Sequence, residues 1–143
     1  MRLLCFQARS FSWRSFKRSL DEVGGVALDA VDVSDELRDC VVVFAHAEQA
    51  DEGDAPRKRA FQQALKHVKW LCNKRAIKRV VLHSFTHLGA VSADPAFANE
   101  FLEELAARLG SVGYHVKLTP FGHLCEWNID VYGESLAKVY KQI

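Results

Sequence analysis

The stretch Val80-Val81-Leu82-His83-Ser84-Phe85-Thr86-His87-Leu88-Gly89 runs from an apolar strand into a polar loop. Asp94-Pro95 follows and predicts the start of a helix, because aspartate caps free backbone N–H groups and proline fits the first helical position. The apolar residues of this helix repeat at helical spacing up to Gly110 and are Phe97, Phe101, Leu102, Leu105 and Leu109. A strand, a polar loop and an amphipathic helix therefore form the central unit of the predicted fold.

The same alternation of strand and helix extends to both sides of this unit. Val41–Ala47 is a continuous apolar run of the buried-strand type, and Arg57–Lys74 has a helical stripe of apolar residues. Further strands are predicted at Met1–Gln7, Ala76–Leu82, Tyr114–Leu118 and about His123–Val131, and a closing helix at Ser135–Ile143. No segment has the composition of a linker, so we expect one single-domain module over residues 1–143. The predicted fold class is α/β, a sandwich with a mixed, partly parallel sheet and packed helices.

The composition limits the class of protein. Of the 143 residues, 49% are hydrophobic, which argues against a disordered chain. The longest apolar runs are far short of the roughly 20 residues of a membrane span, and no signal-peptide core opens the sequence. The four cysteines form no C-x-x-C pair. We therefore expect a cytoplasmic protein with reduced, mostly buried thiols and no membrane partner.

The charges nearly cancel, at 19 Lys plus Arg against 18 Asp plus Glu, but they are sorted along the chain. Eleven acids lie between Asp21 and Asp54, whereas nine Lys or Arg and no acid lie between Arg57 and Arg79. Trp70 falls among lysines on the polar side of the predicted helix, an arrangement that suits a polyanion such as nucleic acid. One alternative is a solvated helix face balanced in space by the acidic segment. Another is a Trp70 covered by a loop or by a second copy of the chain.

Two polar clusters stand at the ends of predicted strands, where open α/β sheets place their ligands. The first runs from His83 to His87 and the second from His123 to Glu126, and the common nucleotide, nucleophile-elbow and zinc-protease motifs are missing. One interpretation is a zinc site, with His83, His87, His123 and Cys125 as ligands. A second is a thiol nucleophile, with Cys125 paired with His87 or His123. A third is that these histidines are structural and bond to backbone carbonyls.

The order of short motifs resembles the archaeal-type editing domain of threonyl-tRNA synthetase. That family has an alanine-histidine-leucine element after a strand, which is Thr86-His87-Leu88 here, and then a proline-introduced helix. A glycine-led strand follows, matched by Gly113-Tyr114-His115-Val116, and then a proline-phenylalanine-glycine turn, matched by Thr119-Pro120-Phe121-Gly122. The opening Met1-Arg2-Leu3-Leu4 is also similar to the family's first strand.

This resemblance implies a fold like that of the D-aminoacyl-tRNA deacylases, usually a homodimer. It also implies hydrolysis of serine wrongly esterified to threonine tRNA, here in trans by a free-standing homologue, with help from the 2′-hydroxyl of the terminal adenosine. Serine and threonine differ by one methyl group, worth only about 1–3 kcal/mol of discrimination, so a second selection step is needed. The implied partners are the 3′ end of an aminoacyl-tRNA and a threonyl-tRNA synthetase. No cofactor is expected, apart from the zinc alternative.

The resemblance and the charge pattern together suggest roles for named residues. His87 matches the family's histidine and would orient or polarise the ester. The other catalytic candidates are His123 and Cys125, and the substrate-binding candidates are His83, Phe121, Gly122 and Glu126. The expected contacts to tRNA phosphates are Arg57, Lys58, Lys66, Lys69 and Lys74.

The sequence also departs from the family's pattern. The tryptophan-tyrosine-lysine after the turn is His123-Leu124-Cys125 here, and the family's last glutamate is Lys138. These departures leave two alternatives to an editing enzyme. One is a non-catalytic module that binds tRNA or a protein, and the other is a zinc- or thiol-dependent hydrolase on the same scaffold.

Overall fold

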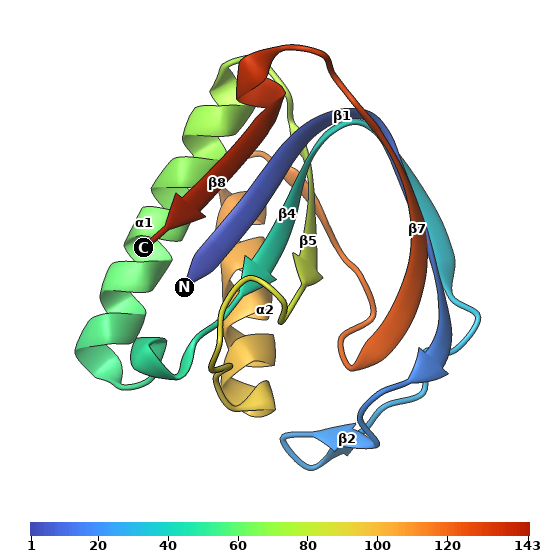
Figure 1. The fold of residues 1–143 in the computed structure, drawn as a ribbon, viewed down its shortest axis with the longest axis vertical. Helices are drawn as coiled ribbons and strands as arrows, with labels where there is room; N and C mark the ends of the chain where they lie inside the picture. Colours follow the sequence, from blue (N-terminus) through green and yellow to red (C-terminus); the bar gives the residue numbers. More distant parts are fainter.

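The computed structural model describes residues 1–143 and consists of one curled sheet, a small hairpin and two long helices (Figure 1). The strands are β1 Arg2–Arg18, β2 Glu22–Val23, β3 Val26–Ala27, β4 Ser34–His46, β5 Arg79–Ser84, β6 His115–Leu118, β7 His123–Val131 and β8 Lys138–Gln142. The helices are α1 Asp54–Asn73 and α2 Pro95–Ser111, and short 3-10 turns lie at Gln49–Asp51 and Ser135–Ala137. Neither long helix combines the length and the apolar character that crossing a membrane requires.

The sheet is mixed, as predicted. Its order is β6-β5-β4-β1-β7, and β8 also pairs with β1. Strands β4, β5 and β6 are parallel, whereas β1 runs antiparallel to β4, β7 and β8. Besides β4, strand β1 pairs with two further strands at successive parts of its length. Residues 2–6 pair with β8 and residues 8–18 with β7.

The two faces of the sheet carry separate cores. Both helices pack on one face, where their apolar stripes meet alternate strand residues such as Leu3, Val43 and Leu82. The opposite face holds a smaller, aromatic core that includes Phe11, Trp13 and Phe44, which are enclosed where the sheet curls over toward β7 (Figure 1). This second core has a direct bearing on the site, because several of its rings continue into the wall of a cavity.

Local signals in the sequence account for the helix that follows β5. The Asp94 carboxylate accepts hydrogen bonds from the backbone N–H groups of Ala96, at 2.8 Å, and Phe97, at 3.4 Å. Pro95 takes the first helical position, where its missing N–H costs nothing. The predicted beginning of α2 is therefore confirmed, and α1 and β7 also lie where they were predicted to within three residues.

The prediction of a closing helix at Ser135–Ile143 is wrong. The segment forms a 3-10 turn at Ser135–Ala137 and then strand β8. Val139 and Ile143 pack against the core at even spacing, as strand residues do, although their spacing with Leu136 also fits a helix. The open edge of β1 decides between the two, because its unpaired backbone groups accept a strand and a helix would leave them unpaired.

Strand β1 is longer than predicted. It continues eleven residues past Gln7, and the extension carries Phe11 and Trp13, both buried, between polar residues. That alternation is the signal of a half-buried strand and was present in the sequence. The extension matters for the site, because its last residues reach the cavity.

Candidate functional site

A cavity of about 500 Å³ lies at the carboxyl end of β5. Its wall comes from the end of β1, the loop after β5, the start of α2, the turn before β7 and the start of β7. Both predicted polar clusters therefore meet at one place. The predicted residues in its wall are His83, His87, Phe121, Gly122, His123 and Cys125. Apart from imidazoles, the polar side chains of the wall are hydroxyls and the Cys125 thiol: Ser19, Ser84, Thr86, Ser92 and Thr119.

His83 is a neutral imidazole fixed at the base of the cavity. Its Nδ1 lies 2.8 Å from the hydroxyl oxygen of Thr119, whereas its Nε2 makes no hydrogen bond within the protein. Burial lowers the pKa of His83 to about 4, because a charged imidazole would lose its hydration there. His83 also packs edge-on against Phe44, with ring centres 5.1 Å apart. His83 thus offers one uncharged nitrogen to a bound molecule.

His87 is the exposed histidine of the wall, and it lies in the loop that follows β5. Neither of its nitrogens hydrogen-bonds to the protein, and its ring contacts Phe85 edge-on at 5.1 Å. Phe85 in turn packs on Phe44, at 5.2 Å. The loop therefore presents an unengaged imidazole on an aromatic support.

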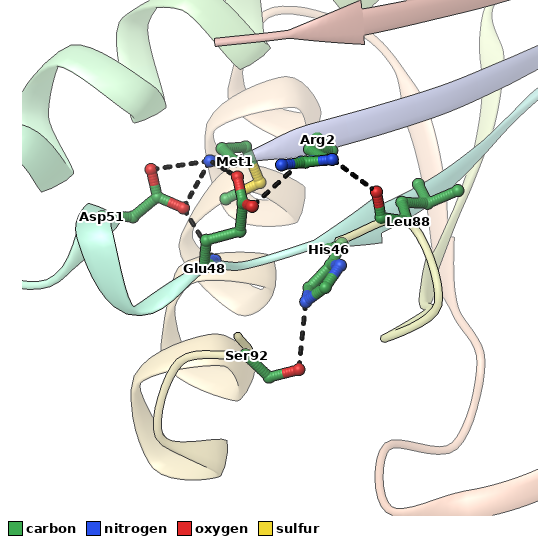
Figure 2. Close-up of polar contacts among 7 residues, drawn as sticks. All are labelled: Met1, Arg2, His46, Glu48, Asp51, Leu88 and Ser92. Carbon is green, nitrogen blue, oxygen red and sulfur yellow. Dashed lines mark hydrogen bonds and ion pairs between the residues drawn. The ribbon is translucent and has the colours of Figure 1, made fainter. Parts of the chain in front are cut away.

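A polar network ties this loop to the start of the chain (Figure 2). The Arg2 guanidinium donates to the Leu88 carbonyl oxygen and to the Glu48 carboxylate, each at 2.9 Å. The Met1 ammonium group contacts Glu48 at 3.0 Å and Asp51 at 2.6 Å. These contacts hold the carbonyl next to His87 in place, so the position of His87 depends on residues more than eighty positions earlier.

The pKa values of Glu48 and His46 are both lowered in this region. Burial favours protonated Glu48, but the charges and hydrogen bonds of the Met1 ammonium and Arg2 outweigh it, and the pKa of Glu48 is lowered. His46, whose Nε2 lies 3.0 Å from the Ser92 hydroxyl oxygen, has a pKa lowered mainly by burial. Ser92 belongs to the cavity wall, so this contact fixes a second point of the loop.

The turn before β7 is locked against the end of β1. The Gly122 carbonyl accepts hydrogen bonds from the N–H groups of Ser19, at 2.8 Å, and Leu20, at 3.1 Å. Gly122 has φ +68°, and a Cβ there would lie 2.3 Å from the Leu28 side chain. The left-handed backbone therefore favours glycine, and a Cβ there would force the Leu28 side chain to move. The structure gives Gly122 this positioning role in addition to its place in the cavity wall.

His123 has both ring nitrogens engaged. Nδ1 donates to the Phe121 carbonyl oxygen at 2.9 Å, and Nε2 accepts from the Ala30 N–H at 3.1 Å. An imidazole with both nitrogens bonded to backbone groups has no free position for proton transfer. His123 thus fits the structural interpretation of the sequence better than the catalytic one.

Cys125 shows none of the features of an activated thiol. Its sulfur contacts the His123 carbonyl oxygen at 3.8 Å, and no imidazole bonds to it. Burial raises the pKa of Cys125, which disfavours the reactive thiolate. The zinc interpretation finds no support either, since no three His, Cys, Asp or Glu side chains in residues 1–143 are arranged to hold a metal ion. Cys125 remains a wall residue, and all four cysteines are free.

Glu126 is not a wall residue, which corrects its predicted place in the substrate site. It is exposed and lies opposite Arg14 in the pairing of β1 with β7. Its neighbours Cys125 and Trp127 both line the cavity, and successive strand residues point to opposite faces of a sheet. The Glu126 side chain therefore lies on the face of β7 opposite to those of Cys125 and Trp127, and it does not reach the cavity.

Several wall residues were missed by sequence reasoning. The end of β1 contributes Phe16, Ser19 and Leu20, and β7 contributes Trp127. Trp127 packs on Phe44 at 5.3 Å and so extends the aromatic core into the wall. Only the period-2 pattern of β1 pointed to such a role, because strand pairing between residues more than one hundred positions apart leaves no local signal.

The predicted basic helix is present, but one of its cations is engaged. Arg57 forms ion pairs with Glu104 at 2.9 Å and Glu100 at 3.5 Å on α2, so it is corrected from a free phosphate contact to a link between the helices. The predicted residues without an ion pair are Lys58, Lys66, Lys69 and Lys74. None of them forms an ion pair with the acidic segment.

Trp70 is 39% exposed on the same side of α1. His67 stacks on its ring with centres 5.5 Å apart, and the Lys74 ammonium group lies over the ring at 5.5 Å. No loop of the chain covers it, so that interpretation is wrong. The helix lies at the left of Figure 1, well away from the start of β7 and the β2 hairpin.

Comparison with known proteins places this fold and cavity in a family. Residues 1–143 match the family described as the archaea-specific editing domain of threonyl-tRNA synthetase. The chain belongs to this family. The resemblance inferred from the short motifs around His87 and Phe121-Gly122 is therefore confirmed over the whole chain.

The curated relatives of this editing domain are threonine–tRNA ligases of archaea. The ligase of Thermofilum pendens is 28% identical over 145 aligned positions, which cover 100% of this chain and 22% of the ligase. That of Methanococcus maripaludis is 31% identical over 118 positions, which cover 82% of this chain and 18% of the ligase. The chain thus spans about a fifth of the length of these relatives.

A solved structure supports the fold. The protein titled c-Myc DNA Unwinding Element Binding Protein superposes on the editing domain with a TM-score of 0.67, over 100% of this chain and 99% of that chain. At 10% sequence identity this likeness shows the fold alone. It confirms the predicted α/β class, with a mixed, partly parallel sheet and packed helices.

Proposed function

We propose that residues 1–143 act as a single editing module that hydrolyses a mischarged aminoacyl ester at the 3′ end of a tRNA, with Ser-tRNA(Thr) as the model substrate. The observation that carries this proposal is the cavity itself. It has the size of a small-molecule site, and its wall offers imidazoles and hydroxyls but no charged side chain. An uncharged wall suits a polar ester better than it suits a phosphate or a carboxylate. Membership of the editing-domain family supports the same function.

The reaction that fits this wall needs little from the protein's own acids and bases. Water adds to the ester carbonyl carbon, the bond to the ribose 3′-oxygen breaks, and the water's proton ends on that oxygen after passing through the 2′-hydroxyl of the substrate. His87, with both nitrogens unengaged, is the residue we assign to orient or polarise the ester. His83, kept neutral by burial and positioned by its hydrogen bond with Thr119, is assigned to hydrogen-bond the substrate.

The proposal includes a setting for this reaction. We infer a cytoplasmic protein that acts in trans, as a homodimer, on tRNA charged by a threonyl-tRNA synthetase. Lys58, Lys66, Lys69 and Lys74 would contact tRNA phosphates, because they are cations without carboxylate partners.

A second candidate function is a non-catalytic module that binds tRNA through the same cavity. It is favoured by a specific observation: two of the three predicted catalytic side chains are poorly suited to catalysis. Both ring nitrogens of His123 are hydrogen-bonded to the backbone, and burial raises the pKa of Cys125. The two candidates differ only in whether bound aminoacyl-tRNA is hydrolysed.

A deacylation assay separates them. Ser-tRNA(Thr), Thr-tRNA(Thr) and a small panel of other aminoacyl-tRNAs would be incubated with the protein, and ester loss compared with the spontaneous rate. We expect faster loss for Ser-tRNA(Thr) than for Thr-tRNA(Thr), and a fall of roughly 100-fold in His87→Ala.

The matched control is His115→Ala, which removes an exposed histidine on β6 outside the cavity. An unchanged rate in His87→Ala would refute the role of that residue. Survival of every ester, together with retained tRNA binding, would refute the deacylase and establish the binding module.

A further inference from the structure

The mouth of the cavity has a rim that the proposed reaction does not use. It consists of Phe16, Leu124 and Trp127, which line the cavity, and of Lys17 and Arg18, which follow Phe16 at the end of β1. We propose that this rim binds the unpaired 3′-terminal nucleotides of the RNA substrate: an aromatic ring stacks on a base, and the two cations contact phosphates. The inference rests on the proposed function, because it assumes that the ester in the cavity is attached to RNA.

A β-bulge directs Phe16 to the rim. Ser15 pairs with Cys125 and Lys17 pairs with the preceding residue, Leu124, so Phe16 is an extra residue with no partner on β7. Bulges commonly occur beside functional sites, where they turn a side chain away from the regular alternation. Here the result is that Phe16 lines the cavity. The residues after β1 are held in place by the hydrogen bonds of Ser19 and Leu20 to Gly122.

Three large apolar side chains of the rim are exposed to solvent. Phe16 is 45% exposed, Leu124 47% and Trp127 45%. Trp127 is supported from behind by Phe11 and Phe44, whereas Phe16 stacks on no other aromatic ring of the protein. Exposed aromatic rings at the edge of a site are the stacking platforms of single-stranded nucleic-acid binding proteins.

The cations beside Phe16 lack carboxylate partners. The Lys17 side chain forms no ion pair or hydrogen bond, and the only side-chain hydrogen bond of Arg18 is to the Leu28 carbonyl oxygen, at 3.2 Å. Both are exposed, and the pairing of β1 with β7 places them opposite Leu124 and His123. An aromatic residue followed by two free cations, at the mouth of a cavity without charge, complements a base followed by its phosphates.

The charge also distinguishes RNA from a second copy of the chain. In a twofold interface the same patch meets itself, so the Lys17 and Arg18 of each copy would approach those of the other. Like charges brought together in this way oppose association. A nucleic-acid strand meets no such repulsion.

The test measures equilibrium binding of uncharged tRNA(Thr), with and without its 3′-terminal CCA, at fixed salt. We expect Phe16→Ala to weaken binding of intact tRNA roughly tenfold and to leave the truncated tRNA unaffected, while Phe16→Trp retains affinity. The double variant Lys17→Ala/Arg18→Ala should weaken binding of intact tRNA and lower the salt dependence by roughly one to two phosphate contacts. Tyr140→Ala, which removes an aromatic side chain 50% exposed on β8, is the control for Phe16→Ala.

Four outcomes are distinguishable once circular dichroism has shown that each variant is folded. Selective weakening on intact tRNA supports the rim as an RNA contact. Equal weakening on both tRNAs, or none, overturns it and leaves deacylation by the wild-type protein intact. A loss of dimers in sedimentation, with unchanged tRNA affinity, overturns it in favour of a contact between copies. Failure of the wild-type protein to bind or deacylate any tRNA overturns the proposed function together with the rim.

Discussion

At the scale of single residues, His83 shows how position determines chemistry. A histidine in water is half protonated near pH 6.5, but burial beside Phe44 and Thr119 lowers the pKa of His83 to about 4. The same imidazole therefore stays neutral throughout the physiological range. His87, four residues later, is exposed in the loop and remains free to contact a ligand.

This lowered pKa has a consequence for stability. Between pH 6.5 and about 4, the unfolded chain binds a proton at His83 that the folded protein does not, so unfolding becomes easier as the pH falls. The gap between the two pKa values corresponds to about 3 kcal/mol in total. In His83→Gln, we expect the fall in unfolding free energy between pH 7 and 4.5 to be smaller by about 2 kcal/mol.

Urea denaturation at the two pH values measures this difference. His46 and His67 also have pKa values lowered by burial, but they are unchanged in the variant and cancel in the comparison. Equal falls in the two proteins would show that His83 is accessible to protons in the folded state.

Gly122 is the residue on which the turn before β7 depends. Its positive φ disfavours any residue with a side chain, and a Cβ there would displace the Leu28 side chain. We expect Gly122→Ala to lower the free energy of unfolding by about 2 kcal/mol or more. Gly133→Ala is the matched control, because nothing lies within 4 Å of a Cβ built there. Comparable losses in the two variants, measured by thermal or urea unfolding, would contradict the role of Gly122.

At the scale of elements, helix α1 has two chemically different faces. Ala60, Ala64 and Val68 bury one face against the sheet. The other face presents lysines around Trp70, and its free cations distinguish it from Arg57, which is paired with α2. A helix that is anchored on one side and positively charged on the other suits contact with the backbone of a large polyanion.

Salt dependence tests this face of α1. In Lys66→Gln/Lys69→Gln/Lys74→Gln we expect tRNA binding to weaken and the slope of log affinity against log salt to become shallower by about 2 to 3. Arg108→Gln on α2, an exposed cation that bonds only within its own helix end, is the control. A slope that does not change would exclude α1 from the tRNA interface and leave the rim at Phe16 as the remaining contact.

Elements also show where sequence patterns were sufficient. The cap formed by Asp94 and Pro95 gave the start of α2, and the apolar run at Val41–Ala47 gave the buried part of β4. In both cases the deciding interactions lie within one segment. The last nine residues differ, because their apolar spacing fits both a helix and a strand, and pairing with β1 selects the strand.

At the scale of the whole molecule, the cavity is a product of the curled sheet. Strand β1 pairs with β8 near its start and with β7 along the rest, which brings residues near 16 and 125 to the loop after β5. Phe44 lies at the centre of this arrangement and contacts Phe85, His83 and Trp127, three rings of the wall. The helices on the other face support the sheet without reaching this aromatic cluster.

The family, the α/β class and part of the cavity wall followed from the sequence alone. They rest on short motifs and on periodic apolar patterns, and each of these is a relation between residues close together in the chain. His83, His87 and the Phe121-Gly122 turn could be selected because each ends or precedes a recognisable strand.

Only the tertiary structure decided what each of those residues does. It engaged His123 with two backbone groups, raised the pKa of Cys125, turned Glu126 to the opposite face and paired Arg57 with α2. It also brought Phe16 and Trp127 to the cavity. Hydrogen bonding, burial and strand pairing all depend on partners distant in sequence, and a single sequence holds no record of which distant residues will meet.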